Sequence, residues 1–263
     1  MSVGSIQAGG DFRVGDVLAR AWNVFIGNFP FFFGITLFVY VVIGIVVGLV
    51  MVPFIIAIGL SIATFDIADV RPETWVLLAI GVVVVVVLFF MLNQIGQAVL
   101  LLGAFQRMRG QPLRVGEALR RAFARFFPLL GLGLLLSLAL MLGFLLLVVP
   151  AVILFCMWWV VVPACVVEGR GPIESMSRSA ALTKGYRWKI FGLAVVVFFM
   201  NVIGNQAFAL LFGLAGEAAS AFGSMLWYVV WTALWNCVLI MTYHDLRVAK
   251  EGIDIEQIAA IFD

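Results

Sequence analysis

Residues 128–167 form a run of forty residues without a charged side chain. As one continuous helix this run would be about 60 Å long, about twice the hydrocarbon thickness of a bilayer. Pro150 lies near its centre, and a proline ends or kinks a helix. The run therefore predicts a hairpin of two membrane spans that turns at residues 148–150, with a single bent helix as the alternative.

Four more uncharged runs are long enough to cross a bilayer as helices. Only 11% of all residues are charged and 65% are apolar, whereas an average soluble domain has about 25% charged residues. This composition indicates that lipid is the solvent, so we expect one all-α polytopic membrane domain over residues 1–263. The four additional runs are 30–58, 75–103, 190–213 and 222–243.

The distribution of basic residues decides between six spans and five. Lys and Arg concentrate in the cytoplasmic loops of membrane proteins. If residues 128–167 cross twice, 15 of the 16 Lys and Arg residues lie on one side of the membrane, and only Arg71 lies on the other. Six transmembrane helices in three hairpins, with both termini in the cytoplasm, are therefore predicted. The N-terminal residues show no signal-peptide pattern.

A short motif recurs before each pair of spans. "RVGDVLARAW" (13–22) matches "RVGEALRRAF" (114–123) without a gap, and Glu174, Met176, Arg178 and Ser179 occupy the same offsets in a third stretch. The motif predicts three units, 12–103, 113–167 and 171–246, each a cytoplasmic surface helix followed by a hairpin. Chance, or a chemistry shared by membrane-surface helices, is the alternative explanation.

The first two copies differ from the third in the side chains of their apolar face. Bulky apolar and aromatic residues line one face of the first two, which predicts helices that lie in the membrane interface. The third copy has small residues, a proline start at Pro172 and a glycine stop at Gly185, so we expect a helix over 172–184 docked on protein. In each copy an acid precedes an arginine by four residues, as in a helical ion pair.

These surface helices supply one set of candidate site residues. Anchoring of the topology is the simpler interpretation, and contact with lipid headgroups or with a protein partner is the second. The candidates for such contact are Arg20, Arg121, Glu174, Arg178, Ala180 and Lys184.

Uncharged polar residues inside the predicted spans supply a second set. The spans contain no Asp, Glu, Lys, Arg or His, which argues against proton-driven transport. The polar residues serve either as hydrogen-bonding glue between helices or as the lining of a substrate pocket. Trp227, Trp231 and Trp235 form a stripe that we interpret as packing or lipid contact. The polar set is Asn93, Gln97, Asn201, Asn205 and Asn236.

Motifs of catalysis and cofactor binding are missing from the sequence. GxSxG, Walker A, HExxH and dinucleotide-binding patterns do not occur, and the three cysteines lie in apolar runs without metal-ligand spacing. We therefore predict no catalytic residues, no cofactor and no metal. The basic residues are explained by topology, so no nucleic-acid partner is expected either.

Two segments resemble a known bacterial membrane-protein family. They are "PACVVEGRGPIESMSRSAALTKGYRWKIFGL" (163–193) and "TYHDLRVAKEGIDIEQIA" (242–259), and "FRVGDVLARAW" (12–22) also fits. The family includes YciC-like proteins and the membrane domain fused to some glycerophosphodiester phosphodiesterases. The resemblance implies a multi-pass protein of the bacterial cytoplasmic membrane and no catalytic residues. An appended phosphodiesterase domain is not seen here, so that activity is not expected.

Two functions agree with these observations. The first is a non-enzymatic scaffold or accessory protein in envelope or lipid processes, whose partners are membrane lipids and a protein at the cytoplasmic face. The second is a translocator of a lipid or small molecule, with the polar faces of the second, fifth and sixth spans lining the path. The sequence predicts neither the substrate nor the oligomeric state.

Overall fold

The computed structural model describes residues 12–64, 72–108 and 115–252, which fold into helices joined by short turns. Six of these segments are long and apolar enough to span a membrane. The predicted all-α membrane fold is thereby confirmed. The helices are α1 (Val14–Gly27), α2 (Phe29–Thr64), α3 (Pro72–Met108), α4 (Val115–Ala124), α5 (Phe126–Leu146), α6 (Val148–Met157), α7 (Val161–Glu168), α8 (Pro172–Thr183), α9 (Arg187–Gly213) and α10 (Glu217–Glu251).

The long uncharged run forms a hairpin, as predicted, but its turn lies elsewhere. The chain reverses at Leu147, and Pro150 is the third residue of α6. The predicted turn at 148–150 is wrong. Proline is tolerated in the first turn of a helix, because the backbone N–H groups there have no intrahelical acceptor and the missing N–H costs no hydrogen bond. The two arms pack closely where Gly143 faces Ala151. A Cβ atom at position 143 would lie only 3.1 Å from the Cα of Ala151, so glycine fits this contact.

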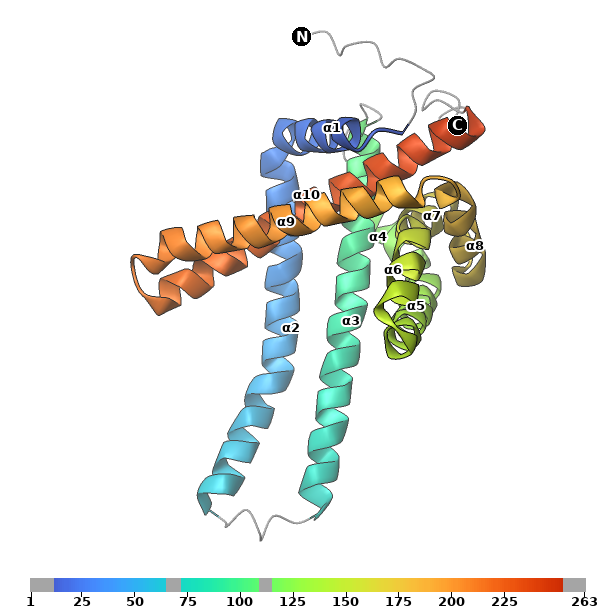
Figure 1. Cartoon of the computed structure of the whole chain (residues 1–263). Coiled ribbons are helices and arrows are strands. Elements are labelled where there is room, and N and C mark those ends of the chain that lie inside the picture. The colour runs from blue at the N-terminus through green and yellow to red at the C-terminus, as the bar shows by residue number, and fades with distance from the viewer. Residues whose placement is uncertain (1–11, 65–71, 109–114, 253–263) are drawn as a thin grey trace.

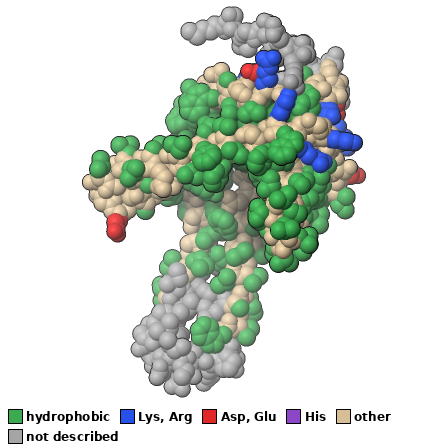
Figure 2. All heavy atoms as spheres, in the orientation of Figure 1, with side chains coloured by type: hydrophobic (Ala, Val, Ile, Leu, Met, Phe, Trp, Pro, Cys, Tyr) green, Lys and Arg blue, Asp and Glu red, His purple; other side chains and the backbone are tan. Residues whose placement is uncertain are grey.

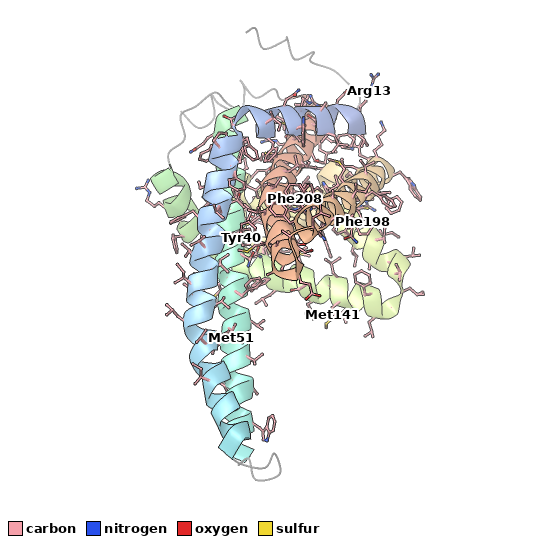
Figure 3. All side chains as sticks on the ribbon, turned by 90° about the vertical axis from the view of Figure 1, so that its left-hand side faces the viewer. Arg13, Tyr40, Met51, Met141, Phe198 and Phe208 are labelled. Carbon is pink, nitrogen blue, oxygen red and sulfur yellow. The ribbon has the colours of Figure 1, made fainter. Side chains whose placement is uncertain are left out.

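The three hairpins diverge from one end of the molecule. In Figure 1 the α2–α3 hairpin runs down the picture and the α9–α10 hairpin crosses it at a steep angle. Figure 3, turned by 90°, shows α9 and α10 nearly end-on, which agrees with this crossing. Lys and Arg side chains gather at the end where α1, α8 and the last turns of α10 lie (Figure 2). We call this end the basic end.

α10 is the central helix at the basic end. Its residues from Ala233 to Leu246 are almost all buried, and they pack in one cluster with side chains of α1, α3, α7, α8 and α9. Tyr243, Ile240 and Leu246 are among the largest fully buried side chains. The sixth span therefore organises the others, although its composition is the least apolar of the six.

The surface helix α1 packs on protein and not only on lipid. Val17, Ala21 and Phe25 are buried, whereas Trp22 is 48% exposed. The apolar stripe of this helix is wide enough to contact two environments. One edge packs against the bundle, and the other carries Trp22 outward.

The docked helix predicted near 172–184 is present as α8, and its contact face is hydroxylated. Ser175, Ser179, Leu182 and Thr183 are buried, whereas Ile173 is 75% exposed. Pro172 occupies the first turn, and Gly185 adopts a left-handed φ of 89° after the helix. The start and stop signals of this helix are therefore confirmed.

A break in the fourth span receives α8. The helix is interrupted between Met157 and Val161, and Pro163 lies in the first turn of the next segment. The interruption leaves the Met157 carbonyl oxygen to accept hydrogen bonds from the hydroxyls of Ser179 (3.0 Å) and Thr183 (3.1 Å). A carbonyl at membrane depth needs such partners, because lipid supplies none.

We expect the double substitution Ser179→Ala with Thr183→Val to lower the free energy of unfolding by about 1–3 kcal/mol. The change leaves the buried Met157 carbonyl without its two donors, and an unsatisfied buried acceptor costs that much. Denaturant unfolding in detergent, followed by tryptophan fluorescence, measures the effect. The matched control is Ser177→Ala on the exposed face of α8, which should be nearly neutral. Equal stability of the two variants would contradict the docking.

Candidate functional site

A cavity of about 710 Å³ lies inside the membrane region, between α2, α3, α6, α9 and α10. It occupies the space that the diverging hairpins leave beside α9, and Figure 2 shows a hollow below that helix. Its walls are mainly apolar and aromatic. This size and lining are typical of sites that bind small molecules or parts of lipids.

The cavity brings together most of the predicted intramembrane polar set. Asn93, Gln97, Asn201 and Asn236 line it, although they come from three different helices. Asn205 does not belong to the lining, because it lies one helical turn beyond Asn201. Of the two pairs with i, i+4 spacing, Asn93 and Gln97 both line the cavity, whereas only Asn201 of the Asn201–Asn205 pair does.

Several of these polar groups are held by hydrogen bonds within the protein. The Asn201 Oδ1 accepts from the Nε1 of Trp227 at 3.1 Å, which joins α9 to α10. The Asn236 Nδ2 donates to the Thr232 carbonyl of its own helix at 2.8 Å. Gln94 bonds to the Leu129 carbonyl at 3.4 Å outside the cavity. Asn201 therefore hydrogen-bonds between two helices, whereas Asn236 hydrogen-bonds within its own helix.

Two polar atoms of cavity-lining residues are buried without a partner. They are the Nε1 of Trp159 and the Oδ1 of Asn236, which have no hydrogen bond within the described part of the chain. Trp159 is 6% exposed and Asn236 is fully buried. The first atom is a donor and the second an acceptor.

The lining extends from buried residues to exposed ones. Leu100, Trp159 and Asn236 are buried, whereas Phe198 and Tyr228 are 60% and 52% exposed. Figure 3 shows Phe198 on α9 and Tyr40 on α2, on opposite sides of α10. The cavity therefore extends from the interior of the bundle to its exposed surface.

Sequence reasoning missed Tyr40, Trp159 and Thr232, which also line the cavity. The hydroxyls of Tyr40 and Thr232 are 3.2 Å apart and join α2 to α10. Pro163 could have indicated the helix break at Trp159, because a proline inside a span disrupts the helix four residues earlier. The Trp stripe on α10 was interpreted as packing or lipid contact, but Trp231 and Trp235 line this cavity.

A second constellation lies at the basic end, where α7, α8 and α10 meet. The Arg178 Nε donates to both carboxylate oxygens of Glu168, at 2.8 and 3.0 Å, and the Tyr243 hydroxyl donates to the same carboxylate at 2.7 Å. Arg178 also pairs with Glu251. We call this the charge cluster; its members are Glu168, Arg170, Arg178, Tyr243, Arg247 and Glu251.

The charge cluster replaces the ion pairs that helical spacing predicted. Glu174 bonds to the Gly171 N–H as part of a helix cap, and Arg178 pairs with Glu168 and Glu251. Arg20 likewise pairs with Asp245 and not with the Asp16 carboxylate. Both predicted pairs are wrong because carboxylates in the less hydrated interior bind the guanidinium groups more strongly than exposed partners do. Burial alone would lower the pKa of Arg178, but the two carboxylates raise it.

The remaining candidates at the surface do not converge. Lys184 is exposed at the end of α8, and Ala180 is half-buried on its side. The side chain of Arg121 lies outside the described residues. The six candidates for headgroup or partner contact thus form no single site in the part of the chain that the structure describes.

We expect Arg178→Met to lower the free energy of unfolding by about 1.5–3 kcal/mol. The substitution removes charge-assisted hydrogen bonds to two carboxylates that are largely shielded from water. Denaturant unfolding in detergent at neutral pH tests this. Lys184→Met, at the exposed residue that follows α8, is the matched control and should change stability little. A neutral Arg178→Met would show that the charge cluster does not hold the helices together.

Comparison of the chain with protein-family models, with curated proteins and with solved structures finds no match.

Proposed function

We propose that this protein binds a lipid-like, amphiphilic molecule inside the membrane and is not an enzyme. The observation that carries the proposal is the cavity, in which polar residues from α3, α9 and α10 meet within apolar walls. Among the sequence-based alternatives, this favours the translocator or carrier of a lipid or small molecule. The basic end would face the cytoplasm of a bacterial cell, in keeping with the distribution of Lys and Arg.

The chemistry of the lining supports binding without catalysis. A hydrolase or transferase needs a nucleophile, an acid–base pair or a metal. The described residues that line the cavity include no Asp, Glu, Lys, Arg, His or Cys, and the described chain has no cluster of metal-ligating side chains. The site is therefore suited to hold an amphiphile and to release it into the surrounding lipid.

A scaffold role is the second candidate, and exposed apolar side chains on α8 and at the start of α9 favour it. Ile173 and Trp188 are 75% and 85% exposed beside the basic residues of this region. Such side chains fit the membrane interface or a protein partner. The resemblance to the YciC-like family agrees with either candidate function, and membership of that family remains a proposal.

We expect Ala194→Trp to abolish retention of lipid by the purified protein. Ala194 lines the cavity, so the indole would fill the space that the ligand needs. Native mass spectrometry after extraction in mild detergent measures the fraction of protein that carries a lipid mass. The expected result is an adduct on the wild type and a loss of at least tenfold in the variant.

The matched control is Val196→Trp, two residues further along α9. Val196 is 41% exposed and does not line the cavity, so the same indole would project into lipid. This variant should keep the wild-type adduct. If both variants retain lipid equally, or if the wild type carries none, the proposed function is wrong.

A further inference from the structure

The described residues of the cavity offer no group that could neutralise a charged headgroup. Its described lining includes no acidic or basic side chain, and its walls are largely apolar. An unpaired phosphate or ammonium group transferred from water to such a site would lose several kcal/mol of hydration without compensation. A ligand whose headgroup enters the cavity is therefore uncharged.

The two unpartnered atoms specify the headgroup further. Trp159 Nε1 is a donor that lacks an acceptor, and Asn236 Oδ1 is an acceptor that lacks a donor. A hydroxyl group donates one hydrogen bond and accepts others, so a single hydroxyl complements both atoms. An ester, an ether or a phosphate diester accepts only, and it would leave the Asn236 oxygen unpaired.

The two residues line the same cavity. The ring of Trp159 packs against that of Trp235 with centroids 5.1 Å apart, and Asn236 is the next residue of α10. Trp159 lies in the break between α6 and α7, where the chain is not constrained to helical geometry. The other side of the cavity is lined by exposed aromatic side chains. The hydrocarbon chains of a ligand would pass between them into the bilayer.

We propose that the ligand is an uncharged lipid that carries a free hydroxyl group, of the diacylglycerol or long-chain alcohol class. The hydroxyl donates to the Asn236 Oδ1 and accepts from the Trp159 Nε1, while the chains lie along the apolar wall. This inference rests on the proposed function and adds the headgroup that the cavity selects.

Three probes with identical acyl chains test the headgroup directly. They are 1,2-dioleoylglycerol, its 3-O-methyl ether and dioleoylphosphatidate, each titrated into the delipidated full chain and quantified by native mass spectrometry. We expect dioleoylglycerol to bind about tenfold more tightly than the ether, because the ether cannot donate one hydrogen bond worth about 1 kcal/mol or more. Phosphatidate should bind most weakly.

Two substitutions separate the roles of the two atoms. Asn236→Leu removes the acceptor, so the alcohol and the ether should then bind equally. Trp159→Phe removes the donor and should weaken both probes by a similar factor, while the preference for the alcohol persists. Asn205→Leu, on α9 outside the cavity, is the control and should leave all three affinities unchanged. Thermal melting of each variant verifies that it is folded.

The outcomes distinguish this inference from the proposed function. If phosphatidate binds the wild type as tightly as dioleoylglycerol, or if the ether equals the alcohol, the hydroxyl assignment is overturned and lipid binding stands. A preference that survives in folded Asn236→Leu also overturns the assignment. If no probe binds the wild type, or if all bind Ala194→Trp equally well, the proposed function itself fails.

Discussion

The ion pair between Glu168 and Arg178 is the interaction on which the arrangement of the hairpins depends. Glu168 ends the fourth span, and its carboxylate receives Arg178 from α8 and Tyr243 from α10. Arg178 reaches α10 a second time through Glu251. Charged groups that are largely buried are costly unless they are paired, and these pairs join the second and third hairpins at one end. The Arg20–Asp245 pair joins α1, which leads into the first hairpin, to the same helix. Beyond this end the hairpins diverge and leave room for the cavity.

α10 connects the two constellations. Tyr243, Arg247 and Glu251 belong to the charge cluster, whereas Thr232 and Asn236 line the cavity about two to five turns earlier on the same helix. The residues between them are buried on all sides. Because both constellations lie on one continuous helix, α10 connects one wall of the cavity to the charge cluster. The structure thus explains why the sixth span combines the strongest burial with the most polar composition.

The fold was largely predictable from the sequence, and the site was predictable only in part. In a lipid environment, long uncharged runs form helices and basic loops lie on one side of the membrane. These two rules predicted six spans. The start and stop of α8 followed from Pro172 and Gly185. Tertiary partners were not predictable in this way: helical spacing suggested Glu174 for Arg178, but burial selected Glu168 and Glu251. The Asn and Gln residues were recognised as candidates because polar groups are rare at membrane depth. Their convergence depends on the crossing of α9 and α10 over α2 and α3, which no local pattern encodes.

Photo-crosslinking tests the occupied cavity most directly. A dioleoylglycerol analogue with a diazirine in one acyl chain would be incorporated into liposomes with the protein, and the crosslinked residues mapped by peptide mass spectrometry. The account predicts crosslinks concentrated at Val195, Phe198 and Trp231, which line the cavity, and their loss when unlabelled dioleoylglycerol is added in excess. Crosslinks spread evenly over exposed residues outside the cavity, such as Leu138, Leu145 and Ile203, and unaffected by the competitor, would contradict it.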